Sequence, residues 1–399
     1  MSTSTTMIGD RRRAALQRSQ SVNRHPSTRD RTTPLPAPPA VFYVMAAVIA
    51  LFVMLGLVMV MSASSISEFH KGKSPWGPFI KQAMWAVFGT AGLVTAMRVP
   101  LHFWRRMVVP TLIVCSLAMF APLVPGLGVN VNGARAWIAI GGLTVQPSEF
   151  LKLASLLFCA HLLAKRQGEM HDPKRTIRPV LWIGGLGAAL SMVQGDLGSA
   201  IVLAAIIFVM LFIAGAPLMP LAAAGVAGAS GAMLFVFSSP FRKDRFTAFL
   251  DIAAHKDHLS YQTYQAMIAL AQGGVTGEGV GRGSSKLGEY LPLAHSDFIF
   301  AVIAEELGFI GIFAVIGGFL LLAYAGMQVA LMATDQFARL IASGIVSWFI
   351  VQAVINAGGV VGLMPVTGLT LPFFSAGGSS LFVTMTAAGL LLNVGRRVR

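Results

Sequence analysis

Long apolar runs separated by short polar stretches make up most of the chain from residue 41 onward. Runs of about 18 or more residues with few charges predict membrane-spanning helices, and somewhat shorter runs remain candidates. Ten runs fit this pattern: 41–62, 79–97, 107–123, 148–164, 180–192, 197–214, 218–237, 298–322, 337–358 and 378–394. We therefore expect an all-α polytopic membrane protein with ten transmembrane helices. The fifth run is short and could fuse with the sixth, which leaves nine spans as the competing count.

The overall composition agrees with a membrane protein. Hydrophobic residues make up 55% of the 399 residues and charged residues only 12%, against roughly 45–50% and about 25% in soluble domains. Such a chain is too apolar for a water-soluble fold. The two cysteines, Cys115 and Cys159, both fall inside apolar runs, so they read as buried apolar residues and imply no disulfide framework.

The net charge of +14 suggests nucleic-acid binding at first, but the positions of the charges argue against it. Nineteen of the 30 Lys and Arg residues fall on one side of a ten-span topology. They are the seven arginines before residue 41, nine residues in or beside the even-numbered loops (Arg98, Arg105, Arg106, Lys165, Arg166, Lys174, Arg175, Arg178, Arg339), and Arg396, Arg397 and Arg399. Positive loops stay in the cytoplasm, so we expect both termini there. A nine-span topology would put the basic C-terminus on the other side.

Two regions follow from these patterns. Residues 1–40 are rich in Ser, Thr, Arg and Pro, cannot build a core, and are expected to form a disordered basic cytoplasmic tail. Residues 41–396 are expected to form the ten-helix membrane domain. No cleavable signal peptide is evident, because the first apolar run begins only at Val41 and is long enough to span a bilayer.

Three of the outward-facing loops are more than connectors. Residues 124–147 are rich in Gly and Asn, residues 359–377 are apolar but broken by Gly and Pro, and residues 238–297 form a large periplasmic loop between the seventh and eighth spans. Irregular backbone survives near a bilayer only when it is buried in protein or lines a cavity. Any chemistry is therefore expected on the outer face. The stretch "DIAAHKDH" in the large loop is read as a solvated helix and not as a metal site.

Three ionisable residues open predicted spans near the outer boundary. Glu149 and Lys152 open the fourth span, and Asp196 opens the sixth. Charges at such positions are expensive, which makes each a functional candidate. Simpler interpretations remain: Glu149 and Lys152 are spaced i,i+3 and can pair on one helix face, and Asp196 can cap a helix.

The eighth span opens with Asp297, the fourth candidate of this kind. Ser296 and Asp297 before an apolar run are also typical of a helix cap with an acid in the first turn. Glu305 lies eight residues further on, roughly 12 Å along a helix axis, and Glu306 points to the opposite face. These carboxylates cannot form a close pair on one straight helix. A hydrolase with paired carboxylates is therefore disfavoured, and Asp297 would act alone or with groups from other spans.

The last span begins with a second polar cluster, "SAGGSSLF", which contains Gly377, Gly378, Ser379 and Ser380. Free N–H groups, glycines and hydroxyls at a helix start favour an anion site, and at the outer headgroup level the natural anion is a lipid phosphate. The alternative is a glycine-rich seam for helix packing, which is common in membrane bundles.

Three blocks of the sequence together resemble the SEDS proteins (shape, elongation, division and sporulation), which are polytopic peptidoglycan glycosyltransferases. The blocks are "NGARAWIAIGGLTVQPSEFLKLA" (132–154), "YLPLAHSDFIFAVIAEELG" (290–308) and "NAGGVVGLMPVTGLTLPFFSAGGSS" (356–380). The resemblance covers essentially everything from residue 41 onward, and the family has the ten-span topology. Four positions depart from the usual pattern: Ala136 stands where an Arg is common, Leu293 where a Glu is frequent, Thr367 where a Lys is frequent and Ala376 where a Tyr is frequent.

The resemblance implies an activity. The family polymerises lipid II, a disaccharide-pentapeptide on undecaprenyl pyrophosphate, at the outer face of the cytoplasmic membrane. Its essential acid matches Asp297, which would deprotonate the acceptor hydroxyl as lipid pyrophosphate leaves with inversion. A general base contributes about 10²–10⁴-fold, so charge stabilisation of the leaving group must supply much of the rest. The residues expected to bind substrate are Lys152, Arg135, Glu149, Gly377, Gly378, Ser379, Ser380, Lys286 and His295.

The basic tail and "TGLTLPF" are similar to the cell-division member of the family. That member works at the septum of the inner membrane with a class B penicillin-binding protein, a transpeptidase, among other division proteins. No cofactor and no nucleic acid are implied, and the need for a divalent cation is left open. A lipid II flippase is the runner-up and predicts internal repeats and polar groups at every membrane depth. A scaffold that only recruits the transpeptidase predicts that substitution of Asp297 has no effect.

Overall fold

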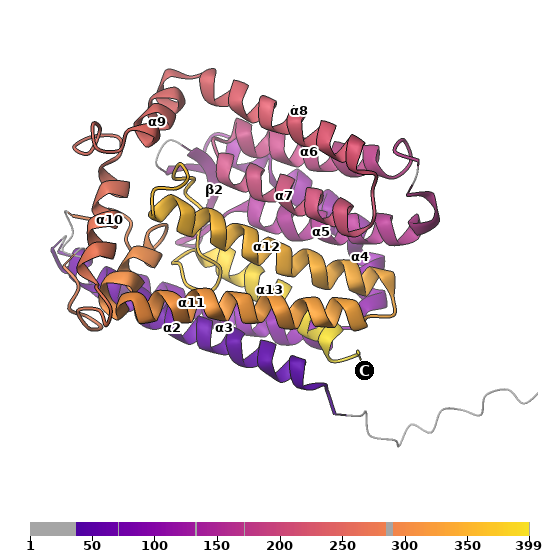
Figure 1. Cartoon of the computed structure of the whole chain (residues 1–399), viewed down its shortest axis with the longest axis horizontal. Helices are drawn as coiled ribbons and strands as arrows, with labels where there is room; N and C mark the ends of the chain where they lie inside the picture. The colour runs from indigo at the N-terminus through magenta and orange to yellow at the C-terminus, as the bar shows by residue number, and fades with distance from the viewer. Residues whose placement is uncertain (1–36, 71, 132–133, 171, 285–289, 399) are drawn as a thin grey trace, which may run out of the picture. The chain divides into compact units, whose positions relative to one another are not determined.

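Twelve α-helices form most of the described part of the chain in the computed structural model (Figure 1). The structure describes all residues except 1–36, 71, 132–133, 171, 285–289 and 399. The predicted tail therefore lies almost entirely outside the described residues. The helices are α2 (Ala40–His70), α3 (Gly77–Arg98), α4 (Leu101–Ala118), α5 (Pro147–Lys165), α6 (Ile177–Val193), α7 (Leu197–Ile213), α8 (Leu218–Phe237), α9 (Pro240–Leu250), α10 (Tyr261–Gln272), α11 (Ile299–Met332), α12 (Gln336–Val360) and α13 (Gly378–Gly395).

Each of the ten predicted spans coincides largely with one helix. Among the described residues, seven helices are long and apolar enough to cross a membrane: α2, α4, α5, α8, α11, α12 and α13. The helices α6 and α7 are apolar but have only 17 residues each. They are separate helices, because Gly195 has a φ of 82° and the side chain of Asp196 caps the start of α7. The protein is thus a polytopic helical membrane protein.

The bundle packs closely where small residues let helices approach. The last helix, α13, lies along α3, and a Cβ atom added at Gly389 would be only 2.3 Å from the backbone oxygen of Leu93. Small residues at such contacts are typical of membrane helices, whose backbones approach closely. By contrast, α8 is exposed along most of its length, as a helix facing lipid would be. The buried core therefore centres on α5, α11, α12 and α13.

A small antiparallel sheet corrects the all-α expectation for the loop 124–147. Strands β1 (Gly128–Val131), β2 (Ala134–Ile140) and β3 (Leu143–Val145) pair in the order β1-β2-β3. Gly141 and Gly142 connect β2 to β3 with φ values of 59° and 81°. Positive φ at both central residues defines the two-residue turn that suits a hairpin, and glycine adopts it without strain. The sequence signal was the Gly-Gly pair between alternating apolar residues.

Helix α11 is interrupted at Gly308, which has φ 64° and ψ −162°. The segment that follows α10 supplies hydrogen bonds on both sides of the break. The Glu278 amide donates to the Glu305 carbonyl (2.9 Å) and the Phe309 amide donates to the Gly274 carbonyl (2.9 Å). A Cβ at Gly308 would lie 2.3 Å from the backbone nitrogen of Gly277. The break is therefore built into the fold by a second segment of chain.

Glu305 and Glu306 are fully buried beside this break and bond to different segments. A Glu305 carboxylate oxygen accepts from the Ser284 amide (2.6 Å) and from the Ser284 hydroxyl (3.0 Å). The Glu306 carboxylate accepts from the Ser62 hydroxyl of α2 at 2.6 Å. These contacts join α11 to α2 and to the loop after α10, which gives both acids a structural role.

Candidate functional site

A buried ion pair lies near the start of α5. The ammonium nitrogen of Lys152 is 2.9 Å from each carboxylate oxygen of Glu149, and the two residues are 1% and 3% exposed. Their i,i+3 spacing places both on one face of the helix. A charge buried without a partner is very costly, so each residue stabilises the charged form of the other. The pairing interpretation of the sequence is thus what the geometry shows.

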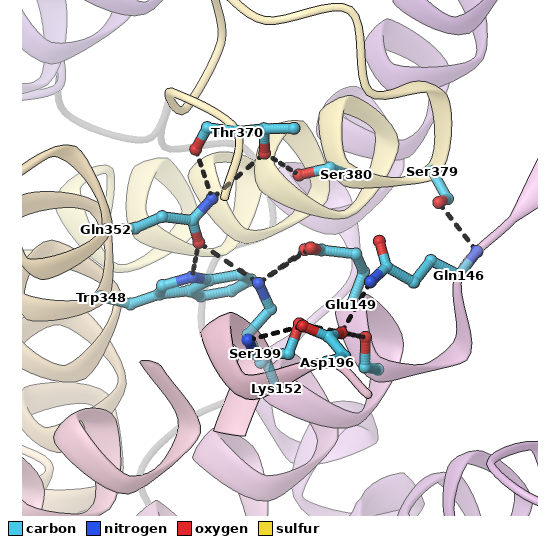
Figure 2. A network of polar contacts seen from close by, with 11 residues as sticks. Gln146, Glu149, Lys152, Asp196, Ser199, Trp348, Gln352, Thr370, Ser379 and Ser380 are labelled. Atoms are coloured by element: carbon cyan, nitrogen blue, oxygen red, sulfur yellow. Dashed lines mark hydrogen bonds and ion pairs between the residues drawn. The ribbon is translucent and has the colours of Figure 1, made fainter. Parts of the chain in front are cut away.

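Helix α12 brings a glutamine and a tryptophan to this pair (Figure 2). The Gln352 carbonyl oxygen accepts from Lys152 Nζ (3.2 Å) and from Trp348 Nε1 (2.8 Å). The ammonium group also lies 5.5 Å from the centre of the Trp348 ring, within the range of a cation–π contact. The side-chain oxygen of Gln352 is therefore fixed, and its amide group must point away from Lys152.

That amide group holds the extended segment before α13. Gln352 Nε2 donates to the Thr370 carbonyl (2.9 Å), and Asn356 Nδ2, one turn along α12, donates to the Leu369 carbonyl (2.7 Å). Asn356 Nδ2 also donates to the backbone carbonyl of Asp297 (2.8 Å). A continuous set of polar contacts therefore runs from Lys152 through α12 to Asp297.

Asp297 lines a small cleft between the start of α11, α12 and the segment 366–369. The cleft has a volume of about 10 Å³, room for roughly one water molecule. Gly368, with a φ of 73°, brings its backbone close to the Asp297 carboxylate: a Cβ there would lie 3.7 Å from Oδ2. Asn356 and Thr367 also line the cleft.

The carboxylate of Asp297 is largely shielded from water, although part of the residue's surface remains exposed to solvent. Burial raises the pKa of Asp297 to about 6, and the nearby positive charge of Arg245 on α9 opposes that rise. Helix α11 has Phe298 at its N-cap position and no side-chain cap. The capping alternative therefore does not describe Asp297, while a pKa near neutrality suits proton transfer.

Asp196 joins α5 and α7. Its Oδ1 accepts from the Ser199 amide (2.9 Å), which caps α7. Its Oδ2 accepts from Gln146 Nε2 (2.7 Å) and from the Ser148 hydroxyl (3.1 Å). These bonds give Asp196 the capping role that the sequence allowed and also anchor the start of α5 (Figure 2).

The hydroxyls at the start of α13 bond to the protein. The Ser379 hydroxyl accepts from the Gln146 amide (3.0 Å), and the Ser380 hydroxyl shares a hydrogen bond with the Thr370 hydroxyl (2.9 Å). A Cβ at Gly378 would lie 2.3 Å from Trp85 Nε1, and one at Gly377 2.7 Å from a methyl group of Thr370. The glycines therefore serve close packing, and the anion-binding role stays a prediction.

Two further predicted substrate residues, Arg135 and His295, connect neighbouring segments through their backbones. Arg135 is exposed on β2, and its backbone amide donates to the Gln194 carbonyl (2.9 Å) in the turn before α7. The His295 carbonyl accepts from the Ala376 amide (2.9 Å), which ties the segment before α11 to the segment before α13. Lys286 falls outside the described residues.

Two non-glycine residues with positive φ flank the site. Leu293 has φ 59° and lies four residues before Asp297, and Phe373 has φ 70° and lies in the segment before α13. Such conformations cost about 1–3 kcal/mol and cluster at functional sites. The strain therefore coincides with the two irregular segments that meet at the Asp297 cleft.

Trp348 and Gln352 of the network were absent from the candidates read from the sequence. Gln146, Ser148, Asn356 and Thr370 fall in the quoted motifs but were not named as site residues. Gln352 and Asn356 are polar residues one turn apart inside an apolar run, and both are buried. Polar residues inside a span are themselves a functional signal. That signal could have identified them without a structure.

Fold and site together define a class: a multi-pass helical membrane protein with a polar network that leads to a partly buried carboxylate at one end of the bundle. Comparison with known sequences gives the family. A profile of the FtsW/RodA/SpoVE family, described as "Cell cycle protein", matches residues 42–399. The chain belongs to this family, which confirms the resemblance read from its motifs.

Relatives and solved structures agree with that assignment. The chain is 38% identical over 355 residues to the "Probable peptidoglycan glycosyltransferase FtsW" of Mycobacterium tuberculosis, covering 89% of this chain and 68% of the relative. It is 39% identical over 343 residues to the protein of the same name in Trichlorobacter lovleyi, covering 85% and 89%. A solved structure described as "Structural coordination of polymerization and crosslinking by a peptidoglycan synthase complex" superposes with a TM-score of 0.73 at 29% identity, covering 91% and 98%.

Proposed function

We propose that Asp297 is the general base of a peptidoglycan glycosyltransferase that polymerises lipid II into glycan strands. The reaction class follows from the family and from the relatives named peptidoglycan glycosyltransferase. The observation that supports Asp297 is its position: a carboxylate with a pKa of about 6 in a cleft bounded by α12 and the segment before α13. Its pKa lets it take up a proton near neutral pH without staying protonated.

The proposed step is a direct displacement. The acceptor sugar hydroxyl attacks the anomeric carbon of the donor and forms a new C–O bond, while the bond from that carbon to the lipid pyrophosphate oxygen breaks. The acceptor proton passes to Asp297, and the pyrophosphate leaves with the electron pair. Attack from the face opposite the leaving group inverts the anomeric configuration. Asp297 then releases its proton to solvent before the next cycle.

Stabilisation of the leaving pyrophosphate calls for accessible cations and N–H donors. For this role we propose Arg135, which is exposed on β2, together with Lys286 and the start of α13 at Gly377–Ser380. Lys152 is enclosed and paired with Glu149. The role of Lys152 is therefore to hold Gln352, which in turn holds the segment before α13 that forms one wall of the cleft. His295, whose carbonyl is bonded to Ala376, positions the segment that carries Asp297.

The cellular setting is proposed from the relatives and from the charge distribution. The relatives compared above are named FtsW, and the solved complex joins polymerization to crosslinking. We propose a ten-span domain over residues 41–396 at the division septum, with both termini in the cytoplasm and a class B transpeptidase as partner. The positive residues at the ends of even-numbered loops support this orientation. The reaction as written needs no cofactor.

The test is polymerisation of labelled lipid II by the purified protein together with its transpeptidase partner. Asp297→Asn keeps the size of the side chain but removes the base, so we expect long glycan from the wild type and none from the variant. Asp244→Asn is the matched control. Asp244 is exposed on α9, so this variant should polymerise lipid II as the wild type does. Equal product from Asp297→Asn would remove Asp297 as the base. Wild-type protein that forms no glycan would favour the scaffold or the flippase.

A further inference from the structure

A second polar cavity lies at the opposite end of the bundle from Asp297. Arg339 and Asn356 are 17 residues apart on α12, which places them roughly 25 Å apart along the helix axis. The cavity has a volume of about 460 Å³. It forms where the first turns of α4 and α12 meet the last turns of α5. The residues that matter for its chemistry are Arg105, His161, Lys165, Thr334, Asp335 and Arg339.

The lining of this cavity is positively charged. Arg105, Lys165 and Arg339 contribute three cations, and Asp335 contributes the one carboxylate among its lining residues. That carboxylate is already engaged, since both of its oxygens accept from Arg105 Nη2 at 2.8 and 2.9 Å. Lys165 and Arg339 therefore face the cavity with two positive charges that no lining carboxylate neutralises.

Arg339 has an unused donor in this place. Its Nη2 donates to the Ala333 carbonyl (3.2 Å), which holds the guanidinium at the start of α12. Its Nε is buried and has no hydrogen-bond partner among the described residues. A buried donor left unpaired costs free energy, and an arginine fork matches the oxygens of a phosphate group. Arg339, which lines the cavity, thus keeps a donor that the described residues leave unsatisfied.

The cavity is also held in shape before any ligand binds. The guanidinium carbon of Arg105 lies 4.7 Å from the centre of the Phe337 ring. The His161 ring packs edge-on against the same phenylalanine, with ring centres 6.3 Å apart. Phe337 itself is fully buried. This aromatic support holds Arg105 and His161 in place and lowers the ordering cost of binding.

We propose that this cavity binds a phosphate group, carried either by an anionic lipid headgroup of the adjacent leaflet or by a soluble phosphate. Positive residues are expected at cytoplasmic helix ends in any membrane protein, and that rule accounts for single cations such as Arg106, which lies outside the cavity lining. It does not explain a polar cavity of about 460 Å³ in which the Arg339 guanidinium keeps an unpaired donor. The proposal is independent of the role of Asp297.

The test separates the two sources of phosphate. The full-length protein is placed in phosphatidylcholine nanodiscs with or without phosphatidylglycerol, and retained lipid is measured by native mass spectrometry. In a second arm, inorganic phosphate or pyrophosphate is added in phosphatidylcholine alone, and the unfolding midpoint is followed. The variants are Lys165→Gln and Arg339→Gln, and the control is Arg106→Gln. Lys165 is exposed, so its variant should fold even if the Arg339 variant does not.

We expect retained phosphatidylglycerol, or the affinity for added phosphate, to fall about tenfold in Lys165→Gln, the loss typical of one charge-assisted hydrogen bond. Arg106→Gln should bind as the wild type does. Loss in the lipid arm alone identifies a headgroup, and loss in the soluble arm alone identifies a free phosphate. Wild-type protein that binds neither probe, or Lys165→Gln that binds as well as the wild type, would overturn the proposal.

Discussion

The side-chain amide of Asn356 donates one hydrogen bond to the backbone carbonyl of Asp297 (2.8 Å) and another to that of Leu369 (2.7 Å). These two carbonyls belong to the segments before α11 and before α13, which meet at the cleft. One side chain on α12 thus sets the separation of the proposed base from the opposite wall of the cleft. The positions of Asp297 and Leu369 depend on a residue that itself carries no charge.

Asn356→Ala should lower polymerisation through misplacement of Asp297. Two buried carbonyls lose their donor, and a misplacement of about 1 Å at a reacting group can cost 10²-fold in rate. We expect the rate constant for polymerisation to fall at least tenfold, measured with labelled lipid II at saturating concentration.

The matched control is Asn393→Ala on α13. Asn393 also donates to two backbone carbonyls, those of Ala96 (2.7 Å) and Val99 (2.6 Å), but between α13 and the end of α3. Both variants should lose similar stability, because each leaves two acceptors unpaired. If Asn393→Ala lost as much activity per folded molecule as Asn356→Ala, the positioning role of Asn356 would be refuted.

The pH dependence of polymerisation should report Asp297. Its pKa is raised from 3.8 to about 6 by burial, and a base works only when deprotonated. The rate should therefore be level above pH 7 and fall about tenfold per unit well below pH 6. Initial rates from pH 5 to pH 8 at constant ionic strength measure this. An unchanged rate across that range would contradict the assignment.

The same pKa predicts a gain in stability for Asp297→Asn. A folded-state pKa above the ordinary value means that the folded protein binds the proton more tightly than the unfolded chain. The ionised carboxylate therefore destabilises the fold increasingly as pH rises from about 4 to about 6. Asparagine removes that charge, so the unfolding midpoint of the variant should exceed that of the wild type at pH 8. The difference should shrink at pH 4.5.

Lys152→Met should destabilise the protein strongly. It leaves the Glu149 carboxylate buried without its cation and removes one of the two donors to the Gln352 oxygen. Removing one partner of a buried ion pair costs about 3–5 kcal/mol. The unfolding midpoint in detergent, followed by intrinsic fluorescence, is the measurement. The double variant Glu149→Gln, Lys152→Met should recover most of the lost stability. A double variant no more stable than Lys152→Met would show that the pair does not account for the loss.

Gly308→Ala tests the break in α11. A Cβ at this position would lie 2.3 Å from the Gly277 backbone nitrogen, and the residue has φ 64°. Strain in a positive-φ conformation costs about 1–3 kcal/mol before any clash. We expect a lower unfolding midpoint and reduced polymerisation. Glu305 and Glu306 lie beside the break and join α11 to α2 and to the loop after α10, so a shift there disturbs these contacts. Gly317→Ala is the control: no atom lies within 4 Å of a Cβ added there, so it should be neutral or mildly stabilising.

Some features could be read from local pattern because they depend on local physics. The ten apolar runs coincide largely with ten helices, since apolar segments of that length satisfy their backbone polar groups within a helix. The motif around Asp297 indicated the proposed base. The burial that raises the pKa of its carboxyl group is a property of the tertiary structure. The hairpin formed by β2 and β3 was not predicted, because β3 has only three residues and the loop is rich in Gly and Asn, so alternation is weak on one side of Gly141 and Gly142.

The sequence by itself determined the membrane class, the helices and the family, because length, apolarity and contiguous motifs are properties of neighbouring residues. Only the tertiary structure decided that Gln352 of α12 contacts the buried Lys152 and that Gln352 and Asn356 hold the segment before α13. It also decided that Asn356 bonds the backbone carbonyl of Asp297 beside the cleft. The contact between Lys152 and Gln352 joins residues 200 positions apart in the chain. Hydrogen bonds over such separations depend on how helices pack, which no local pattern encodes.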